Sequence, residues 1–406
     1  MNTKFVSCRI CGEELALEAS FGDMYVSDFI SDSSEAVSGR LDIGKCTECG
    51  VVQLANNDVD LDFMYKDHYW YRSALNASML SDLKDVVDSA EKFELSEGDV
   101  VLDIGTNDGS LFKFYSTPNL YKVGFDPAPN IIDVASSRCN FFENDYFTLD
   151  AYKHVGKKAK VITSIAMFYD LPYPLEFVSD ISEVLDEDGV WIVQFTDLLS
   201  MLKVNAIDNI CAEHLEYYRL FDVVSLVEPF GLEVFDVEYN NVNGGSIRIF
   251  IGFEGKHVVE DNVLSALIHE ANYLLTDSIP KLTERIEVFS EKINKYLDET
   301  TGDVYGMAAS TKGNTLLQLL KLDSKSIISI GEVNEDKFGL MTTGTLIPIV
   351  PEKEVLDAMP EVIIVLAWHF RKTFAKVLGK YIENGGTVLY PLPVPEVHTK
   401  TGVELL

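Results

Sequence analysis

The stretch that decides the fold is Val101-Leu102-Asp103-Ile104-Gly105-Thr106-Asn107-Asp108-Gly109-Ser110. It reads as an apolar strand that ends in an acidic residue and runs into a glycine turn. A second apolar strand, Lys122-Val123-Gly124-Phe125, ends in Asp126, which lies 23 residues after Asp103. Glycine lets the backbone approach a ligand without a Cβ clash. An acid at the end of the next strand is placed to bind the two hydroxyls of a ribose.

The turn does not contain the G-x-G-x-x-G pattern that wraps a pyrophosphate. It therefore predicts a ligand with a ribose but no phosphate beside the loop, and S-adenosylmethionine (SAM) fits that description. The candidate cofactor residues are Asp103, Gly105, Asn107, Gly109, Asp126, Asp145 and Tyr146. The last two lie in Asn144–Phe147, before the next predicted strand, and offer an acid for the adenine amine and an aromatic wall. An ordinary turn contains the same residue types, and an ordinary strand–turn–helix is the alternative for the whole motif.

Length and charge limit the classes of protein to which the chain can belong. Its 406 residues suggest two to three domains, and 47% apolar residues are ample for packed cores. The formal net charge of −32 disfavours nucleic acid as a partner, because phosphate backbones require many Lys and Arg contacts. No apolar run approaches the roughly 20 residues that span a bilayer, and the N-terminus has no signal-peptide core. We expect a soluble, cytoplasmic protein that is a monomer or a small homo-oligomer.

Four of the six cysteines form two C-x-x-C pairs, each followed by glycine: Cys8/Cys11 and Cys46/Cys49. Such doubled pairs predict a tetrahedral thiolate site for a structural zinc ion. The 34 residues between the pairs exceed a short zinc-finger spacer, so we expect a zinc ribbon with a looped-out insert. A redox pair or two disulfides are the alternatives, and disulfides are disfavoured in the cytosol.

The segments between these motifs predict an α/β protein with several units. An N-terminal zinc-binding domain covers residues 1–60, and an aromatic and helical linker covers 61–95. Alternating strands and helices over 96–254 predict a Rossmann-like class I SAM methyltransferase domain with a mainly parallel sheet. Residues 255–406 predict an amphipathic helix over 258–300, broken near Pro280, and then a second, smaller Rossmann-like domain. Expected strands include 161–165, 190–194, 232–239, 246–253, 304–308, 327–330 and 362–366.

The candidate reaction residues lie in Cys211-Ala212-Glu213-His214-Leu215-Glu216-Tyr217-Tyr218. Histidine, with an ordinary pKa of about 6.5, is a competent base near neutrality. His214 is therefore the candidate base, and Glu213 could orient its ring or bind a substrate hydroxyl. A lone histidine on a helix is more often structural or solvated, and that alternative stays open.

In their order and spacing these motifs resemble the zinc-containing, SAM-dependent C-methyltransferases that act on nucleotide-activated deoxysugars, the 3-C-methyltransferases of antibiotic and surface-polysaccharide sugars. The resemblance covers nearly the whole chain. Besides the cysteines, the Asp103–Gly109 loop and Glu213-His214, it includes Asn243-Gly244-Gly245-Ser246-Ile247-Arg248 and Lys312-Gly313-Asn314-Thr315-Leu316-Leu317. The resemblance implies that a base removes a proton next to a ketone on a thymidine-diphosphate sugar. The resulting enolate then attacks the methyl group of SAM.

The resemblance also implies roles for individual residues. His214 would be the base or a partner of the enolate, with Glu213 on the sugar and Tyr71 or Tyr69 closing over the site. The residues expected at the substrate are Tyr69, Tyr217, Asn243, Arg248, Lys312 and Asn314. Lys312 could contact a diphosphate, as could Arg371 and Lys372, although the last two are as readily explained as solvated surface groups.

The chain departs from the family pattern at three positions near the predicted reacting centre. Cys211 stands where a tyrosine is common, Ala212 replaces a frequent histidine, and Asn243 precedes the glycine pair where histidine is frequent. We therefore interpret the chain as a divergent branch. Methyl transfer to nitrogen or oxygen of a related nucleotide sugar or another small molecule is the second hypothesis, and a non-catalytic nucleotide-sugar binding protein is the third.

Overall fold

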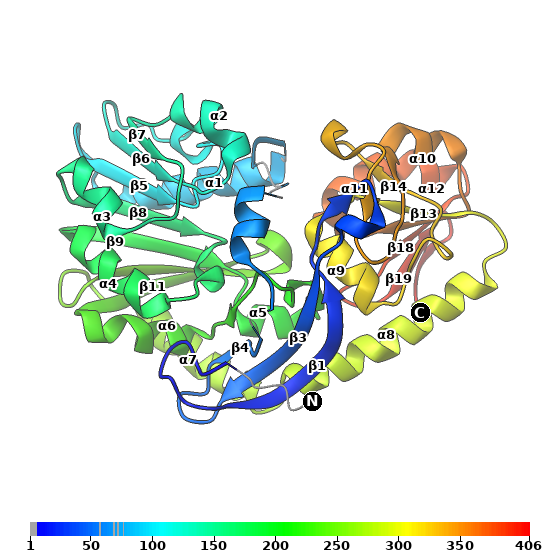
Figure 1. The fold of residues 1–406 in the computed structure, drawn as a ribbon, viewed down its shortest axis with the longest axis horizontal. Coiled ribbons are helices and arrows are strands. Elements are labelled where there is room, and N and C mark those ends of the chain that lie inside the picture. The colour runs from blue at the N-terminus through cyan, green and yellow to red at the C-terminus, as the bar shows by residue number, and fades with distance from the viewer. Residues whose placement is uncertain (1–5, 57, 68–69, 71–72, 76) are drawn as a thin grey trace.

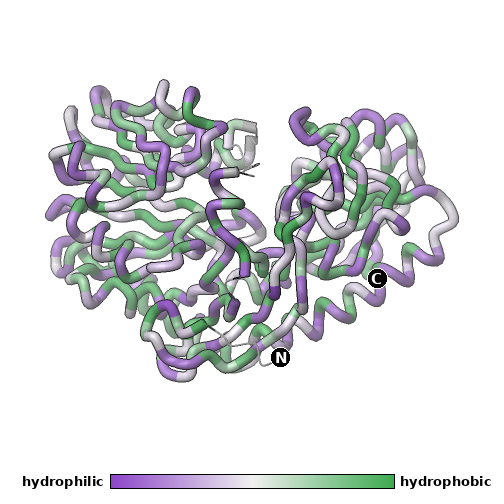
Figure 2. Tube along the Cα trace, in the orientation of Figure 1, coloured by the Kyte–Doolittle hydropathy of each residue, from purple (hydrophilic) through white to green (hydrophobic). Residues whose placement is uncertain are grey.

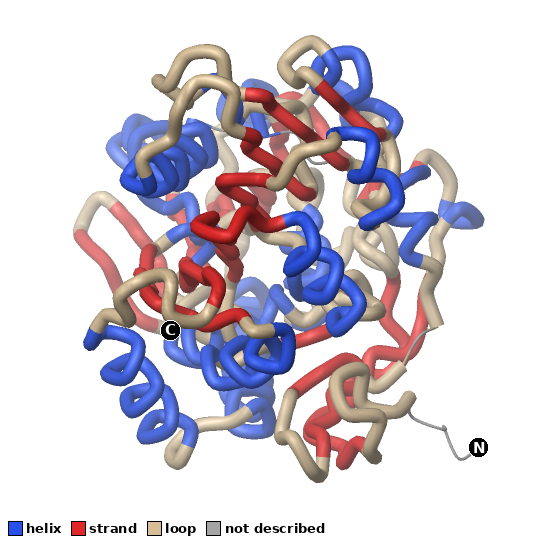
Figure 3. The backbone as a smooth tube through the Cα atoms, turned by 90° about the vertical axis from the view of Figure 1, so that its left-hand side faces the viewer, coloured by secondary structure: helices blue, strands red, loops and turns tan. Residues whose placement is uncertain are grey.

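The computed structural model describes residues 6–56, 58–67, 70, 73–75 and 77–406. Its strands form two seven-stranded sheets, one four-stranded sheet and one two-stranded sheet. The two large sheets lie in separate lobes, which β1 (Leu15–Tyr25), β3 (Ser38–Cys46) and the long helix α8 (Ile279–Glu299) connect (Figure 1). In the perpendicular view, strands occupy the interior and most helices lie around them (Figure 3). The predicted α/β class is confirmed.

The first large sheet has the strand order β11-β12-β9-β8-β5-β6-β7. Its strands are β5 Val100–Ile104, β6 Tyr121–Phe125, β7 Phe141–Glu143, β8 Ala159–Ile165, β9 Leu185–Phe195, β11 Leu232–Asn240 and β12 Ser246–Phe253. The five strands from β7 to β9 pair in parallel, and β12 runs antiparallel to both β9 and β11. Burial on both faces explains why β5 and β8 are mainly apolar.

Helices cover both faces of this sheet. Helix α1 (Ala77–Ala90) packs Leu83, Val86 and Val87 into one core with Val101 of β5. On the opposite face α4 (Pro174–Val184) and α6 (Leu220–Val227) contribute to a second core. The short helices α2 (Ile132–Ser136), α3 (Leu149–Tyr152) and α5 (Leu198–Lys203) complete this lobe.

The four-stranded sheet joins the N-terminal segment to the first lobe. It contains β1 (Leu15–Tyr25), β3 (Ser38–Cys46), β4 (Val52–Leu54) and β10 (Glu216–Tyr217), in the order β1-β3-β4-β10. The insert between the cysteine pairs is thus a long β1–β3 hairpin. The segment that connects β1 to β3 contains a two-residue strand, β2 (Phe29–Ile30), which pairs with β15 (Met341–Thr342) of the second lobe. The N-terminal segment therefore contacts both lobes.

The second large sheet has the order β16-β14-β13-β17-β18-β19-β20. Its strands are β13 Val304–Met307, β14 Ile330–Glu332, β16 Ile349–Pro351, β17 Val362–Val365, β18 Thr387–Tyr390, β19 Glu396–Thr399 and β20 Gly402–Leu405. The strands from β16 to β18 pair in parallel, and β19 and β20 add antiparallel pairs. The predicted strand over 327–330 is shifted: the Ile327 amide closes a turn on the carbonyl of Asp323, and the strand begins at Ile330.

Four short helices accompany this sheet: α9 Thr311–Leu319, α10 Glu352–Ala358, α11 Arg371–Val377 and α12 Gly379–Glu383. The predicted broken helix is two helices, α7 (Asp261–Leu274) and α8 (Ile279–Glu299), with Pro280 in the first turn of α8. Proline is tolerated there because that turn has no intrahelical partner for its N–H. Along α8, apolar and polar segments alternate (Figure 2). Among the described residues, no helix combines the length and the apolar character needed to cross a bilayer.

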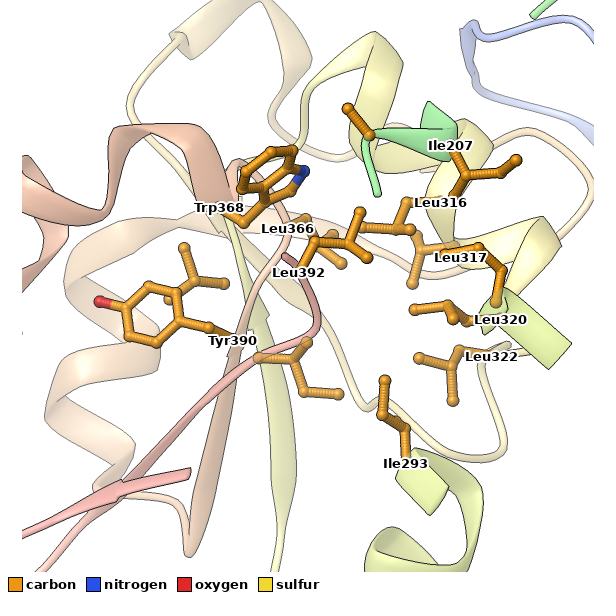
Figure 4. Packing of buried hydrophobic residues seen from close by; sticks show 14 of the residues in the cluster. Ile207, Ile293, Leu316, Leu317, Leu320, Leu322, Leu366, Trp368, Tyr390 and Leu392 are labelled. Atoms are coloured by element: carbon orange, nitrogen blue, oxygen red, sulfur yellow. The ribbon is translucent and has the colours of Figure 1, made fainter. Parts of the chain in front are cut away.

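The hydrophobic core of the second lobe continues into the first. Ile207, from a single 3-10 turn of the first lobe (Ile207–Asn209), belongs to the same buried cluster as Leu316 and Leu317 of α9. Figure 4 shows these three side chains close together, with Trp368 and Leu392 beside them. The lobes are thus packed together at this turn, which leads directly into the predicted reaction segment.

Candidate active site

The loop after β5 is shaped by residues in left-handed backbone conformations. Gly105 (φ +73°) and Gly109 (φ +70°) flank Asn107 (φ +50°). A Cβ at Gly105 would lie 3.2 Å from Cγ of Met167, so both the φ angle and the space favour glycine. The loop follows the carboxyl end of β5. The strand order of the sheet reverses between β5 and its neighbour β8, and open α/β sheets bind ligands at such a point.

Two buried carboxylates hold this loop. Asp103 accepts hydrogen bonds from the hydroxyls of Thr163 (2.6 Å) and Thr106 (2.9 Å), and burial raises its pKa to about 7. Asp126 accepts from the backbone N–H groups of Asn107 (2.8 Å) and Ala128 (3.0 Å), and burial raises its pKa to about 6. A carboxylate has about four lone-pair sites, so Asp126 can still accept from a ribose.

The segment after β7 contacts the N-terminal linker. Tyr146 donates its hydroxyl to Asp62 (3.0 Å), and Lys66 forms an ion pair with Asp145 (3.2 Å). The Lys66 ammonium also lies 4.9 Å from the centroid of the Tyr146 ring. This segment leads into α3 and not directly into a strand, which corrects the sequence interpretation. Its role at the adenine stays a prediction.

The two predicted lid residues, Tyr69 and Tyr71, lie outside the described residues. The described residues around them do reach the proposed site. The backbone N–H of Ser73 donates to Oδ1 of Asn107 (3.0 Å). Trp70 donates its indole N–H to Asp28 (2.6 Å). The linker therefore lies against the cofactor loop on one side and the β1–β3 hairpin segment on the other.

His214 lies in a loop between the 207–209 turn and β10, and not on a helix. Its Nδ1 is 2.7 Å from the carbonyl oxygen of Asn209. A carbonyl only accepts, so Nδ1 carries the proton and Nε2 keeps its lone pair. The Tyr169 ring packs against the imidazole, with 4.2 Å between the ring centroids. Burial, and secondarily the charge of Lys312, lowers the pKa of His214 to about 3, so the ring is neutral at neutral pH.

A group of unpartnered polar atoms surrounds this histidine loop. The buried side-chain atoms without a hydrogen-bond partner within the described structure include Glu213 Oε2, Asp170 Oδ1, Asp208 Oδ1, Tyr217 OH and His369 Nδ1. Burial raises the pKa values of the three carboxyl groups. An unsatisfied buried polar group costs about 1–3 kcal/mol, so this arrangement suits a polar ligand with several hydrogen-bonding groups.

Lys312 brings a positive charge to the same group from the N-terminal turn of α9. Its ammonium donates to Oδ1 of Asn209 (2.6 Å). Burial lowers the pKa of Lys312, and the nearby acids Asp208, Glu213 and Asp170 oppose that shift. Sequence reasoning missed Asp170, Asp208 and His369. An acid shortly after the β8 strand was the available signal for Asp170. Asp208 and His369 had no local signal, because they meet only through the packing of the lobes.

Other residues predicted at the substrate have structural partners. Arg248 is 1% exposed, and its guanidinium lies 2.9 Å from Asp85, 3.2 Å from Glu238 and 3.6 Å from Asp82. It joins α1 to the sheet, and its contact with a substrate stays a prediction. Arg371 likewise pairs with a carboxylate, at 2.7 Å from Glu396.

Asn314 and Asn243 also lie at contacts between segments. The Asn314 amide donates to the carbonyl of Asp28 (2.9 Å) and to the hydroxyl of Thr343 (2.7 Å). Asn243 adopts φ +53° in the β11–β12 turn. The next residue, Gly244, lies so close to Trp368 that a Cβ would be 2.6 Å from Cη2 of the indole. Neither asparagine is shown to contact a substrate.

The four predicted metal ligands lie together. One sulfur from each of Cys8, Cys11, Cys46 and Cys49 falls within 4.8 Å of the others. Gly12 (φ +81°) and Gly50 (φ +76°) complete the two turns, and their N–H groups donate to the carbonyls of Cys8 and Cys46. Four thiolate sulfurs that each bind a tetrahedral ion at about 2.3 Å lie less than 4.8 Å from one another. The donor set therefore fits a closed metal site.

This cysteine cluster is connected to the histidine loop through Arg9. The guanidinium of Arg9 donates to the carbonyls of Leu54 (2.8 Å) and Leu215 (3.4 Å), and lies 3.6 Å from Glu216. Leu215 directly follows His214 in the chain. The first cysteine turn thus supports the loop that carries the candidate reaction residues.

A cavity of about 240 Å³ adjoins the same loop. Ala212 and Leu215 line one side, and Arg40, Asn56, Asp58 and Asp60 supply polar groups. The remaining lining residues are Leu54, Val59, Leu61 and Pro172. Because Ala212 directly precedes Glu213, part of a ligand in this cavity would lie next to the histidine loop.

Two family models match consecutive parts of the chain. Residues 75–237 match the family model described as a methyltransferase domain, and residues 241–393 match the model described as the C-methyltransferase C-terminal domain. Among solved structures, an O-methyltransferase family protein from Burkholderia thailandensis is 17% identical, covering 45% of this chain and 59% of its own, with a TM-score of 0.33. Magnesium protoporphyrin IX methyltransferase from Synechocystis PCC 6803, with bound SAH, is 14% identical, covering 43% and 87%, with a TM-score of 0.34.

The two family matches, which follow one another along the chain, define a SAM-dependent methyltransferase. The chain is similar to C-methyltransferases. One such relative, the C-methyltransferase NovU of Streptomyces niveus, is 27% identical over 405 residues, which covers 96% of either chain.

Proposed function

We propose that this protein transfers the methyl group of SAM to a carbon atom next to the ketone of a nucleotide-activated keto-deoxysugar, resembling a thymidine-diphosphate sugar. Such a reaction belongs to the biosynthesis of natural-product or surface-polysaccharide sugars. The observation that carries the proposal is the neutral His214 ring among unpartnered buried polar atoms, in a chain that matches the C-methyltransferase C-terminal domain. The similarity to NovU supports the same acceptor atom.

The residues present suit this chemistry. Bound SAM would supply an electrophilic methyl group, and Asp126 would accept hydrogen bonds from its ribose. The bare Nε2 of His214 would take the proton from the carbon, while the C–H electron pair would pass into the enolate. Lys312 and the carboxyl group of Glu213 lie in the same cluster. They would stabilise the negative charge on the enolate oxygen, because fixed charges and hydrogen-bond donors act strongly in a buried site.

Zinc in the cysteine cluster is part of the same proposal. Four thiolates would close the coordination shell, so the ion would stabilise the fold and would not take part in the reaction. The Arg9 contacts described above support an indirect effect of the ion on the histidine loop.

The test is incubation of the protein with SAM and a panel of thymidine-diphosphate 4-keto-sugars, followed by detection of adenosylhomocysteine. Carbon NMR of the product then identifies the acceptor, because C–CH₃, N–CH₃ and O–CH₃ carbons have different shifts. His214→Asn and Glu213→Gln should lose about 10²–10⁴-fold in kcat, the range of general acid–base catalysis. His154→Asn, at an exposed histidine, is the matched control. Absence of adenosylhomocysteine with every keto-sugar would contradict the proposal.

One observation favours a second function, methyl transfer to an amine. A histidine whose pKa is about 3 is a weak base, and a neutral amine attacks a methyl group without prior removal of a proton. Cys211 does not supply another base, because burial raises the pKa of its thiol. An N–CH₃ signal in the product would select this function over C-methylation.

A further inference from the structure

The second lobe holds two successive residues of the first lobe next to the reaction loop. The indole N–H of Trp368 donates to Oδ2 of Asp208 (2.9 Å), and the Lys312 ammonium donates to Oδ1 of Asn209 (2.6 Å). Ile207, the residue before them, is buried in the core of the second lobe (Figure 4). The 207–209 turn is therefore fixed by the second lobe, although it belongs to the first.

Asn209 connects this contact to His214 through two separate oxygen atoms. Its side-chain oxygen accepts from Lys312, and its backbone carbonyl accepts from Nδ1–H of His214 (2.7 Å). Two hydrogen bonds, joined only by the covalent bonds of Asn209, thus connect α9 to the imidazole. Since the carbonyl selects the tautomer, the position of Asn209 decides which ring nitrogen bears the lone pair.

We propose that Lys312 is a positioning residue for methyl transfer, which acts across the lobe interface through Asn209 to hold the His214 ring with Nε2 bare. This inference rests on the proposed function, because it assigns how the proton-accepting nitrogen of that same site is prepared. The second lobe thereby contributes to the reaction, because it fixes the tautomer and the ring position of His214 in the first lobe. It also gives Lys312 a role other than the diphosphate contact expected from the sequence.

The charges around the ring agree with this role. Besides Lys312, the titratable groups of the cluster are Cys211 and Glu213 on the same loop, Tyr217 of β10, Tyr169 and Asp170 after β8, Asp208 in the turn, and His369 of the second lobe. Burial raises the pKa values of the acids, which favours their neutral forms. Burial, and secondarily the charge of Lys312, lowers the pKa of His214, and both favour the neutral ring.

The experiment compares Lys312→Met with Lys325→Met in the full-length protein. Lys325, in the same lobe, has a side chain that is 91% exposed and serves as the matched control. The ring nitrogens are followed by ¹⁵N-histidine NMR over a pH titration without any substrate, and His214→Asn identifies the His214 signals. Wild type and control should show Nδ1–H and a bare Nε2 through the neutral range. In Lys312→Met the ring should titrate about one pH unit or more higher, since a nearby like charge has been removed.

Turnover provides the second measurement. A misplaced base costs about 100-fold in kcat, so Lys312→Met should lower kcat by that order while the Kd for SAM stays within about twofold. Asn209→Ala removes the acceptor of Lys312 but keeps the backbone carbonyl, and it should also lower kcat. It keeps the inference testable if Lys312→Met does not fold.

Two outcomes would overturn the inference. One is an unchanged His214 titration and tautomer in folded Lys312→Met. The other is a rise in the KM of the nucleotide sugar with kcat unchanged, which would make Lys312 a diphosphate ligand. Because the NMR titration requires no substrate, a wild-type protein inactive on every keto-sugar would count against the proposed function and not against the Lys312 inference.

Discussion

Trp368 donates its indole N–H to Oδ2 of Asp208 across 2.9 Å, and this bond joins the two lobes beside the reaction loop. Trp368→Phe keeps an aromatic ring but removes the donor. A buried carboxylate oxygen that loses its partner costs about 1–3 kcal/mol, so we expect a lower thermal midpoint and a lower kcat. Differential scanning fluorimetry and steady-state kinetics measure both, with Trp191→Phe as a comparison at a buried indole inside the first lobe, where it donates to Ser164. An unchanged midpoint and kcat would show that packing alone holds this contact.

Asp126 provides a prediction for the cofactor. Asp126→Asn should weaken SAM binding by about 10- to 100-fold, because a charge-assisted hydrogen bond contributes about 1.5–3 kcal/mol. Isothermal titration calorimetry measures the Kd. Asp133→Asn, in α2, is the control at another aspartate of the same lobe. A Kd for Asp126→Asn equal to that of wild type would remove Asp126 from the ribose site.

The pKa of about 6 for Asp126 gives the same site a pH dependence. Bound ribose hydroxyls favour the ionised carboxylate, so SAM should bind in full strength above pH 6 and more weakly as the pH falls below it. The expected loss approaches about tenfold in Kd per pH unit. The slope should disappear in Asp126→Asn. A Kd that is flat between pH 5 and pH 7 in the wild type would contradict this assignment.

Much of the fold follows from local sequence, whereas the site follows from it only in part. The Asp103–Gly109 strand and turn and the paired cysteines could be predicted, because each carries its geometry within a few residues. The two-residue strand β10 could not be predicted, since its partner β4 lies about 160 residues earlier. The meeting of Asp208 with Trp368 depends on packing between the lobes. The ion pairs of Arg248 with Asp82 and Asp85 could not be predicted either, because these acids lie about 160 residues earlier in the chain.

The cysteine cluster predicts one zinc ion per chain. Cys11→Ser should lower the bound zinc measured by elemental analysis, and should lower kcat, because the Arg9 contacts to the histidine loop lose their support. Metal-dependent folding energies in small zinc domains are about 10–16 kcal/mol, so the N-terminal sheet should become protease-sensitive. Cys139→Ser, a cysteine outside the cluster, should retain both zinc and activity. Equal zinc content in the two variants would contradict the assignment.

Ala212 tests whether the 240 Å³ cavity receives part of the substrate. Ala212→Phe would place a ring in the cavity without touching the Asp103–Gly109 loop. If the acceptor occupies this space, the KM for the nucleotide sugar should rise by about tenfold or more, since one lost apolar contact or clash is worth about 1–3 kcal/mol. The Kd for SAM should stay within about twofold of wild type. Ala212→Ser, which changes the volume little, separates a steric effect from a polar one. If Ala212→Phe keeps the wild-type KM, the acceptor binds elsewhere, and the unpartnered atoms of Asp170 and Glu213 would then have to be reached from the side of the second lobe.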